Sequence, residues 1–186
     1  MYAGHLDFAH PLIRTLDDAL PPALCAAYVA RIEDAAEPEQ APIVGKDLRP
    51  AIELETRNNT RVMWDDPAEA ESLLARVRDH VPATFHEQRL HGANPRLRLY
   101  RYAPGQKHGV HWDTEVELPG GVRSRMTLVF YLDHDFEGGQ TDFPELGERI
   151  EPRAGRALVF QHRVLHSAMP VTRGVKHVLR TDILYR

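Results

Sequence analysis

Apolar residues recur at helical spacing in two places in the first half of the chain. The first place follows Asp17 and Asp18, where prolines suit the opening turn of a helix. Its apolar face consists of Leu24, Cys25, Tyr28, Val29 and Ile32. A second helix is predicted to begin at Asp66-Pro67, because Glu69 completes a capping-box pattern. Its apolar stripe consists of Leu73, Leu74, Val77 and Val81.

From about residue 95 the apolar pattern changes to the periodicity of strands. In LRLYRY, Leu97 and Leu99 fall on one face while Tyr100 and Tyr102 fall on the other. RMTLVFYLD is a nearly continuous apolar run, which is typical of a central strand. RALVFQH and VKHVLRTDILYR indicate further strands. Short strands separated by glycine and proline favour a sandwich or a barrel.

Helices followed by strands predict an α+β domain, with two helices packed on one sheet of a β-sandwich. The 186 residues are enough for one domain with a substantial core. We therefore expect a single domain over residues 1–186. It divides into a helical support region over residues 1–95 and a β-rich core over residues 96–186.

Composition excludes several classes of protein. The net charge of −4 at pH 7 gives no basic surface, so we expect no nucleic-acid partner. Cys25 is the sole cysteine, which rules out an intramolecular disulfide and a cysteine-based zinc site. The N-terminal segment has neither a basic region nor a long apolar run. We therefore expect a cytoplasmic protein that does not bind membranes, and the sequence leaves the oligomeric state open.

The chemistry is concentrated in the segment KHGVHWDTE, which contains an H-x-D pair. His111 and Asp113 are two residues apart, so both would point to one face of a strand. An imidazole and a carboxylate supply two thirds of the facial triad that binds non-haem Fe(II). An H-x-D pair alone is common by chance, so a third ligand from another strand is needed. The candidates are His134, His162, His166 and His177.

Three ordered segments resemble the 2-oxoglutarate- and Fe(II)-dependent dioxygenases, and among them the prolyl 4-hydroxylase-like group. The first resemblance, in YRYAPGQKHGVHWD, is carried by Tyr102, Gly105, His108, His111 and Asp113. The second, in LVFYLDHDFEGGQTDFP, is carried by Tyr131, Leu132, Gly138, Gly139, Thr141, Phe143 and Pro144. The third, in LHSAMPVTRGVK, is carried by His166, Pro170, Val171, Gly174 and Lys176.

The resemblance implies a double-stranded β-helix, or jelly roll, that holds Fe(II) through His111, Asp113 and His166. It also implies 2-oxoglutarate as cosubstrate and O2 as oxidant, with release of succinate and CO2. The expected reaction is hydroxylation of an aliphatic C–H bond. The residues expected to bind 2-oxoglutarate are Lys176, Arg180, Tyr131 and Tyr102, with Lys176 placed ahead of Arg180 as the partner of the distal carboxylate.

The substrate is less constrained by the sequence. Arg57, Asn59 and Arg61 share one face if their segment is extended, so they are candidates to contact a substrate. A solvated edge strand explains the same pattern equally well. We expect a small-molecule or peptidyl substrate, such as an amino acid residue of a protein, a free amino acid or a small metabolite.

Two other classes of protein stand beside the dioxygenase. A cupin-like metal enzyme that is not an oxygenase would share the barrel, but cupins favour H-x-H where this chain has Asp113. A metal-binding jelly-roll module without catalysis is the other alternative. The full set of His111, Asp113, His166 and Lys176 argues against it.

Overall fold

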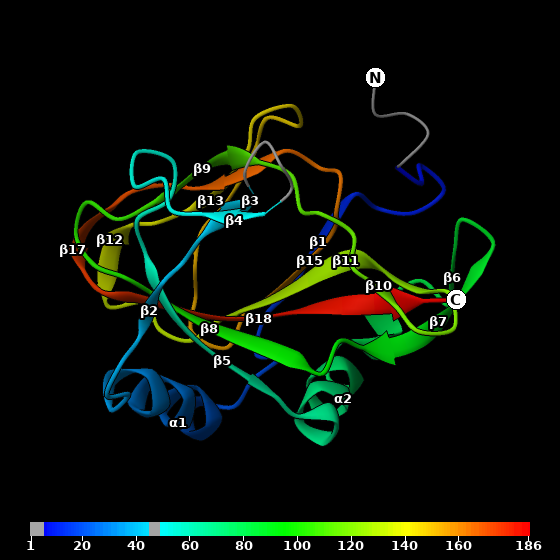
Figure 1. Ribbon diagram of the computed structural model, residues 1–186, viewed down its shortest axis with the longest axis horizontal. Coiled ribbons are helices and arrows are strands. Elements are labelled where there is room, and N and C mark those ends of the chain that lie inside the picture. The colour runs from blue at the N-terminus through cyan, green and yellow to red at the C-terminus, as the bar shows by residue number, and fades with distance from the viewer. Residues whose placement is uncertain (1–5, 45–48) are drawn as a thin grey trace.

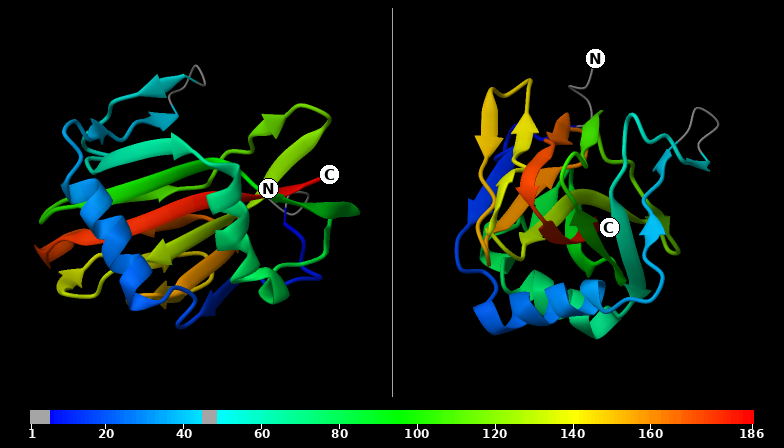
Figure 2. Two further views of the ribbon diagram at one scale, coloured as in Figure 1. Left: turned by 90° about the horizontal axis from the view of Figure 1, so that it is seen from below. Right: turned by 90° about the vertical axis from the view of Figure 1, so that its left-hand side faces the viewer.

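The computed structural model describes residues 6–44 and 49–186 and has the expected layered arrangement. Helices α1 (Pro22–Glu33) and α2 (Pro67–Ala75) lie on one face of a large sheet (Figure 1). A smaller sheet lies on the opposite side of the large sheet, as Figure 2 shows. The expected α+β double-stranded β-helix with helices on one sheet is therefore confirmed.

The large sheet forms the backbone of the fold, and its central strands β11, β18 and β8 are antiparallel neighbours. In spatial order the sheet contains β1 (Ile13–Leu16), β15 (Ala157–Gln161), β11 (Val122–Tyr131), β18 (Lys176–Tyr185), β8 (Arg96–Tyr102), β5 (Thr60–Asp65) and β2 (Glu39–Gln40). Attached to it are β6 (Thr84–Phe85), β7 (Gln88–Ala93) and β10 (Glu117–Leu118). The region before residue 95 thus supplies strands as well as helices.

The small sheet carries the segments that the sequence singled out for chemistry. Its order is β14 (Glu148–Ile150), β13 (Thr141–Phe143), β16 (His166–Ala168) and β9 (His108–His111). Two separate two-stranded sheets complete the described strands, β12 (Phe136–Gly138) with β17 (Val171–Gly174) and β3 (Ile43–Val44) with β4 (Pro50–Ala51). Pairing of β9 with β16 brings residues 55 positions apart in the chain into register, with His166 opposite His111.

Helix α2 begins as its sequence predicts, but only half of the capping box forms. The Asp66 side chain accepts a hydrogen bond from the Glu69 amide at 2.9 Å. The Glu69 carboxylate does not return to the helix start, because it accepts hydrogen bonds from Tyr28 of α1 and Trp64 of β5, both at 2.7 Å. Glu69 therefore joins the two helices to the sheet.

The apolar stripe predicted for the second helix continues beyond its end. The helix stops at Ala75, where the backbone turns to shorter i→i−3 hydrogen bonds and a short 3₁₀ helix, η1 (Arg78–His80). Val77 and Val81 are nevertheless buried with Leu73 and Leu74. The pattern therefore predicted which side chains enter the core, although it overestimated the length of the helix.

Two apolar clusters divide the core between the layers. The first lies between the helices and the large sheet and includes Ile32, Leu74 and Leu99. The second lies inside the jelly roll and includes Tyr100, Tyr131 and Phe160. Alternation along β8 explains the division, since Leu97 and Leu99 belong to the first cluster while Tyr100 and Tyr102 belong to the second.

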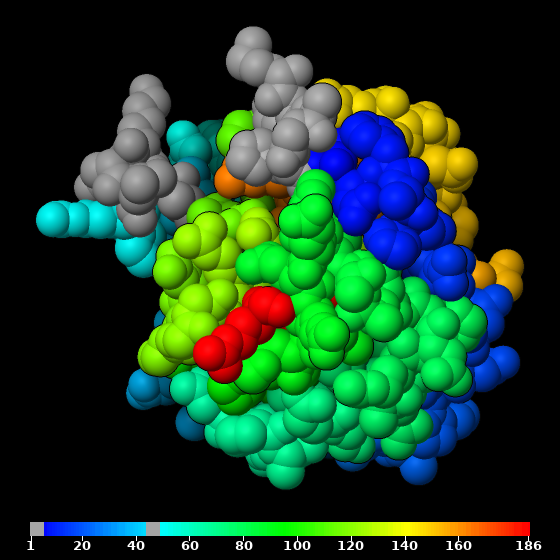
Figure 3. All heavy atoms as spheres, turned by 90° about the vertical axis from the view of Figure 1, so that its right-hand side faces the viewer, coloured from blue at the N-terminus to red at the C-terminus, as the bar shows by residue number. Residues whose placement is uncertain are grey.

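The C-terminal strand is anchored at the surface beside β7, where the red end of the chain meets green residues in Figure 3. The backbones of Arg186 and Arg89 exchange hydrogen bonds of 2.9 and 2.7 Å. This pairing holds the C-terminal end of β18. The same strand begins at Lys176 and has Arg180 near its middle. Among the residues that the structure describes, no helix is long and apolar enough to cross a bilayer.

Candidate metal centre

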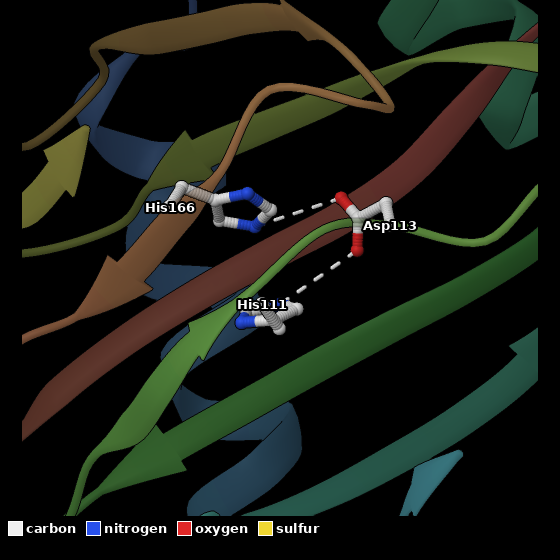
Figure 4. Close-up of side chains that lie close together, drawn as sticks. All are labelled: His111, Asp113 and His166. Atoms are coloured by element: carbon white, nitrogen blue, oxygen red, sulfur yellow. Dashed lines mark ion pairs between the residues drawn. The ribbon is translucent and has the colours of Figure 1, made fainter. Parts of the chain in front are cut away.

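Three side chains from the small sheet and the loop after it converge on one point. His111 ends β9, His166 begins β16, and Asp113 follows β9, and all three point toward one another in Figure 4. The His111 Nε2 lies 3.8 Å from Asp113 Oδ1, and the His166 Nε2 lies 3.7 Å from Asp113 Oδ2. One ligand atom from each residue lies within 4.8 Å of the other two. This donor set fits a single divalent first-row metal.

His111 and Asp113 lie close together, but not because they share one face of a strand, as the sequence predicted. Strand β9 ends at His111, so Asp113 is not on the strand. Its position is fixed instead by a hydrogen bond of 2.9 Å from its own amide to the carbonyl of His162. The expected shared strand face is therefore wrong as an explanation, although the two side chains do meet.

Backbone carbonyls orient both imidazoles. The Nδ1 of His111 donates to the Gly109 carbonyl at 2.8 Å, and the Nδ1 of His166 donates to the Val164 carbonyl at 3.0 Å. Because a carbonyl only accepts, each ring carries its proton on Nδ1 and directs the lone pair of Nε2 toward Asp113. This tautomer is the one that an Nε2-bound metal requires.

The protonation states also suit a metal. Burial, aided by the neighbouring His166, lowers the pKa of His111 to about 3. Burial likewise lowers the pKa of His166. Burial alone would raise the pKa of Asp113, but the charges of Arg180, His166 and His111 outweigh it and hold that pKa well below its usual range. At neutral pH the site therefore presents two neutral imidazoles and one carboxylate.

Two further side chains hold the Asp113 carboxylate, and one of them, Thr127, was not predicted from the sequence. Thr127 of β11 donates its hydroxyl to Asp113 Oδ2 at 2.5 Å. Arg180 of β18 places Nη1 2.8 Å from Asp113 Oδ1, while its Nη2 lies 3.2 Å from Asp182. Asp182 is 1% exposed and also receives a hydrogen bond from Arg98 at 3.1 Å. Side chains of the large sheet therefore bind both carboxylate oxygens of Asp113.

A cavity opens beside these side chains, and all four residues expected to bind 2-oxoglutarate line it, namely Lys176, Arg180, Tyr131 and Tyr102. The Lys176 Nζ lies 5.2 Å from the ring centre of Tyr102 and 5.5 Å from that of Tyr131. The Tyr131 hydroxyl forms a hydrogen bond of 2.6 Å with the hydroxyl of Thr141, which also lines the cavity. One wall of the cavity thus combines an amine with hydroxyl groups.

Lys176 has an unusual environment for an amine. Its side chain is only 2% exposed, and its Nζ donates to the carbonyl of Gly139. Within the described part of the chain no carboxylate pairs with it, and burial lowers its pKa to about 7. Arg180, by contrast, has both terminal nitrogens engaged by Asp113 and Asp182. Lys176 is therefore the cation better placed to receive an anion that enters the cavity.

The three candidate substrate residues have different surroundings. Arg57 is 7% exposed and lines the cavity. Asn59 is fully buried and supports Arg57, accepting a hydrogen bond of 2.9 Å from its Nε. Arg61 turns away to Glu39 of β2, with an Nε–Oε1 distance of 2.6 Å. Of the three, Arg57 alone lines the cavity.

The remaining histidines that were candidate ligands lie outside the triad. His134 is exposed, and His177 is bound between Asp133 and Glu33. His162 is buried behind the site, with its Nε2 3.7 Å from Asp182. His108, which carried part of the resemblance without a role, stacks on His111 with ring centres 3.5 Å apart. Of these candidates, the register between β9 and β16 brings His166 to His111 and Asp113.

The sequence of this region is similar to a known protein family. Residues 97–181 match the family model described as the 2OG-Fe(II) oxygenase superfamily, where 2OG is 2-oxoglutarate. The matched segment contains all three converging residues together with Lys176 and Arg180. The resemblance expected from the three motifs is therefore confirmed for this segment. The expected enzyme class, a dioxygenase, agrees with this match and stays a prediction.

The relatives are of the prolyl hydroxylase type. The chain is 34% identical over 101 residues to the Acanthamoeba polyphaga mimivirus protein named "Putative prolyl 4-hydroxylase". That match covers 44% of this chain and 41% of the relative, so the chain spans less than half of that protein's length.

Solved structures of the same type share the fold. A Pseudomonas putida prolyl-4-hydroxylase matches with a TM-score of 0.68 and 21% identity, covering 100% of both chains. A viral collagen prolyl hydroxylase from Paramecium Bursaria Chlorella virus-1, in complex with 2OG, matches with a TM-score of 0.66 and 22% identity over 94% of this chain and 96% of that one. A Trichoplax adhaerens prolyl hydroxylase in complex with a peptide fragment of a hypoxia inducible factor matches with a TM-score of 0.68 and 14% identity, covering 92% and 83%.

Proposed function

We propose that this chain is a dioxygenase that uses Fe(II) and 2-oxoglutarate to hydroxylate an aliphatic C–H bond. In this reaction 2-oxoglutarate, O2 and the substrate R–H give succinate, CO2 and R–OH. The observation that carries the proposal is the buried convergence of His111, Asp113 and His166 within a segment that matches the oxygenase family. Two neutral imidazoles and a carboxylate are the donors that this metal takes.

The residues support the metal site in three ways. His111 and His166 would bind through Nε2, since their Nδ1 atoms already donate to carbonyls. Asp113 would bind as a carboxylate whose orientation is set by Thr127 and Arg180. A set of three protein ligands leaves coordination positions for a small chelating molecule. Fe(II) held there would supply the redox chemistry by which 2-oxoglutarate and O2 together oxidise a substrate.

For the cosubstrate we propose that Lys176 binds the distal carboxylate of 2-oxoglutarate. The amine is buried, unpaired with any carboxylate of the described residues, and lies beside the metal ligands in the same cavity. Tyr131 and Tyr102 frame this end of the cavity and would contact the same group. Arg180 would act on the cosubstrate only indirectly, as a positioning residue that holds Asp113.

We infer that the substrate is an amino acid, free or within a peptide. The relatives named as prolyl hydroxylases, one of them solved with a peptide fragment, support this class.

The test is a turnover screen with Fe(II), O2 and 2-oxoglutarate, in which succinate is quantified and products are examined for the mass of one added oxygen atom. Free amino acids and short peptides form the panel. Wild-type protein should release succinate, and Asp113→Ala and His166→Ala should reduce release to background. His134→Ala, which changes an exposed histidine, is the matched control and should leave release unchanged.

A protein that binds metal at the triad but never consumes 2-oxoglutarate would contradict the dioxygenase. That result would instead favour a non-oxygenase metal enzyme of cupin-like type or a metal-binding module without catalysis. Succinate release that survives Asp113→Ala would contradict the assignment of the ligands.

A further inference from the structure

Arg57 brings a positive charge into the cavity from outside the matched segment. It lies between β4 and β5 and forms an isolated antiparallel bridge with His108 of β9. Its side chain is 7% exposed and lines the same cavity as His111 and His166. The guanidinium is therefore built into the wall of the candidate active site.

The partners of Arg57 are all neutral. Its Nε donates to the Asn59 side-chain oxygen at 2.9 Å, and its Nη1 donates to the carbonyl of Pro42 at 3.1 Å. Its Cζ lies 4.9 Å from the ring centre of Tyr100. Within residues 6–44 and 49–186 no carboxylate lies within the 4.0 Å of an ion pair. An arginine cannot shed its proton, so this buried charge lacks a counterion.

Neither the metal ligands nor the proposed cosubstrate supplies that counterion. Arg180 already pairs with Asp113 and Asp182. One carboxylate of 2-oxoglutarate would chelate the metal and the other would meet Lys176, which leaves Arg57 as the remaining cation that lines the cavity. Burial alone would raise the pKa of Tyr100, but the positive charges of Arg57, Arg180 and Arg98 outweigh it and lower that pKa.

We propose that Arg57 binds a carboxylate of the substrate, so that the enzyme acts on a molecule carrying a carboxylate close to the hydroxylated carbon. The planar guanidinium suits a carboxylate because it donates two parallel hydrogen bonds. Two sources share this chemistry, the α-carboxylate of a free amino acid and the acidic side chain of a peptide. This inference rests on the proposed function and specifies its substrate class.

The test measures binding without turnover, using protein loaded with Mn(II) and saturated with 2-oxoglutarate under nitrogen. The probes are matched pairs of free L-amino acids and their amides, beginning with L-proline and L-prolinamide, and short peptides that differ by Asp against Asn. Affinity is measured by calorimetry, and the shift in Tm gives a second readout. The acid of at least one pair should bind about 10–100-fold more tightly than its amide, since a charge-assisted pair is lost.

The variants separate recognition from folding. Arg57→Gln should reduce the preference for acids to less than about threefold, because the charge-assisted pair is removed. Arg57→Lys, which keeps the charge, should retain part of the preference. Arg61→Gln is the matched control, since Arg61 pairs with Glu39 and does not line the cavity, and it should keep the full preference.

Three results would overturn the inference. In the first, amides bind as tightly as acids in every pair, or no acid binds at millimolar concentration. In the second, Arg57→Gln keeps the preference. In the third, Arg57→Gln weakens binding of 2-oxoglutarate itself by as much as binding of the acid, which would assign Arg57 to the cosubstrate. Failure of wild-type protein to bind 2-oxoglutarate would contradict the proposed function instead, so the two failures are distinguishable.

Discussion

Binding of 2-oxoglutarate should weaken as the pH rises above neutrality, because the buried Lys176 amine loses its proton. Burial lowers the pKa of Lys176 to about 7 in the free protein. A carboxylate bound against the amine would restore its pKa toward the ordinary value of about 10.4. Binding above neutral pH would therefore require uptake of one proton, and the pH dependence of affinity follows from this difference.

The size of this pH effect on the Kd for 2-oxoglutarate follows from the linkage between proton binding and ligand binding. With a free pKa of about 7, the apparent Kd should be about twofold above its low-pH limit at about pH 7, about tenfold at about pH 8 and about 100-fold at about pH 9. The change between about pH 7 and about pH 9 is then about 50-fold, or about 2.3 kcal/mol. The lowered pKa of His111, about 3, keeps that ligand neutral throughout this range.

The assay is calorimetric titration of the Mn(II)-loaded protein with 2-oxoglutarate in buffers of different ionisation enthalpy, which measures proton uptake together with Kd. Lys176→Met should lose most of the affinity and also the pH dependence, whereas Lys107→Met, at a site outside the cavity, should lose neither. A Kd that stays constant from about pH 6 to about pH 9 would refute the reasoning, since a permanently charged partner such as Arg180 would give that result.

Three further perturbations test other parts of the account. Thr127→Val removes the hydroxyl that holds Asp113 and should weaken Mn(II) binding about 10–100-fold in a metal titration, and an unchanged affinity would exclude a positioning role. Burial alone would lower the pKa of His177, but the hydrogen bonds that its ring donates to Asp133 and Glu33, and their charges, outweigh burial and raise it. Its contribution to the free energy of unfolding should therefore be complete below about pH 6.5 and lost as pH rises through the raised pKa. His177→Gln should abolish that pH dependence in urea unfolding, and an unaltered profile would contradict the assignment. Asp66→Ala should cost about 1 kcal/mol of stability in the same assay through loss of the α2 cap, and a change near zero would show that the cap is not needed.

The parts of the structure that the sequence predicted are those fixed by local pattern. The alternation along β8 assigned Leu99 and Tyr100 to different layers of the core, and both are buried there. The Asp66 cap formed because its donor is three residues away. The return bond of the capping box did not form, because Tyr28 and Trp64 compete for Glu69 and their approach depends on tertiary packing.

The parts that the sequence did not predict depend on register between distant strands. Pairing of β11 with β18 places Thr127 opposite Asp182 and Val129 opposite Arg180, which brings the Thr127 and Arg180 side chains to Asp113. No periodicity within either strand encodes that register. For the same reason the ion pair between Arg180 and Asp113 was not predicted, and the expected role of Arg180 toward the cosubstrate stays a prediction. Lys176 and Arg180 lie four residues apart on the same face of β18, so the sequence could not predict that their surroundings differ.

The central claim is that His111, Asp113 and His166 hold one metal ion with positions left for 2-oxoglutarate. The most direct measurement is an anaerobic titration of the protein with Fe(II) and then with 2-oxoglutarate, followed by calorimetry and by the visible absorption of an iron-bound 2-oxo acid. We predict one Fe(II) per chain, 2-oxoglutarate binding that requires the metal to reach full affinity, and loss of both in Asp113→Ala. Fe(II) binding that is unaffected by Asp113→Ala, or full-affinity 2-oxoglutarate binding without metal, would contradict it.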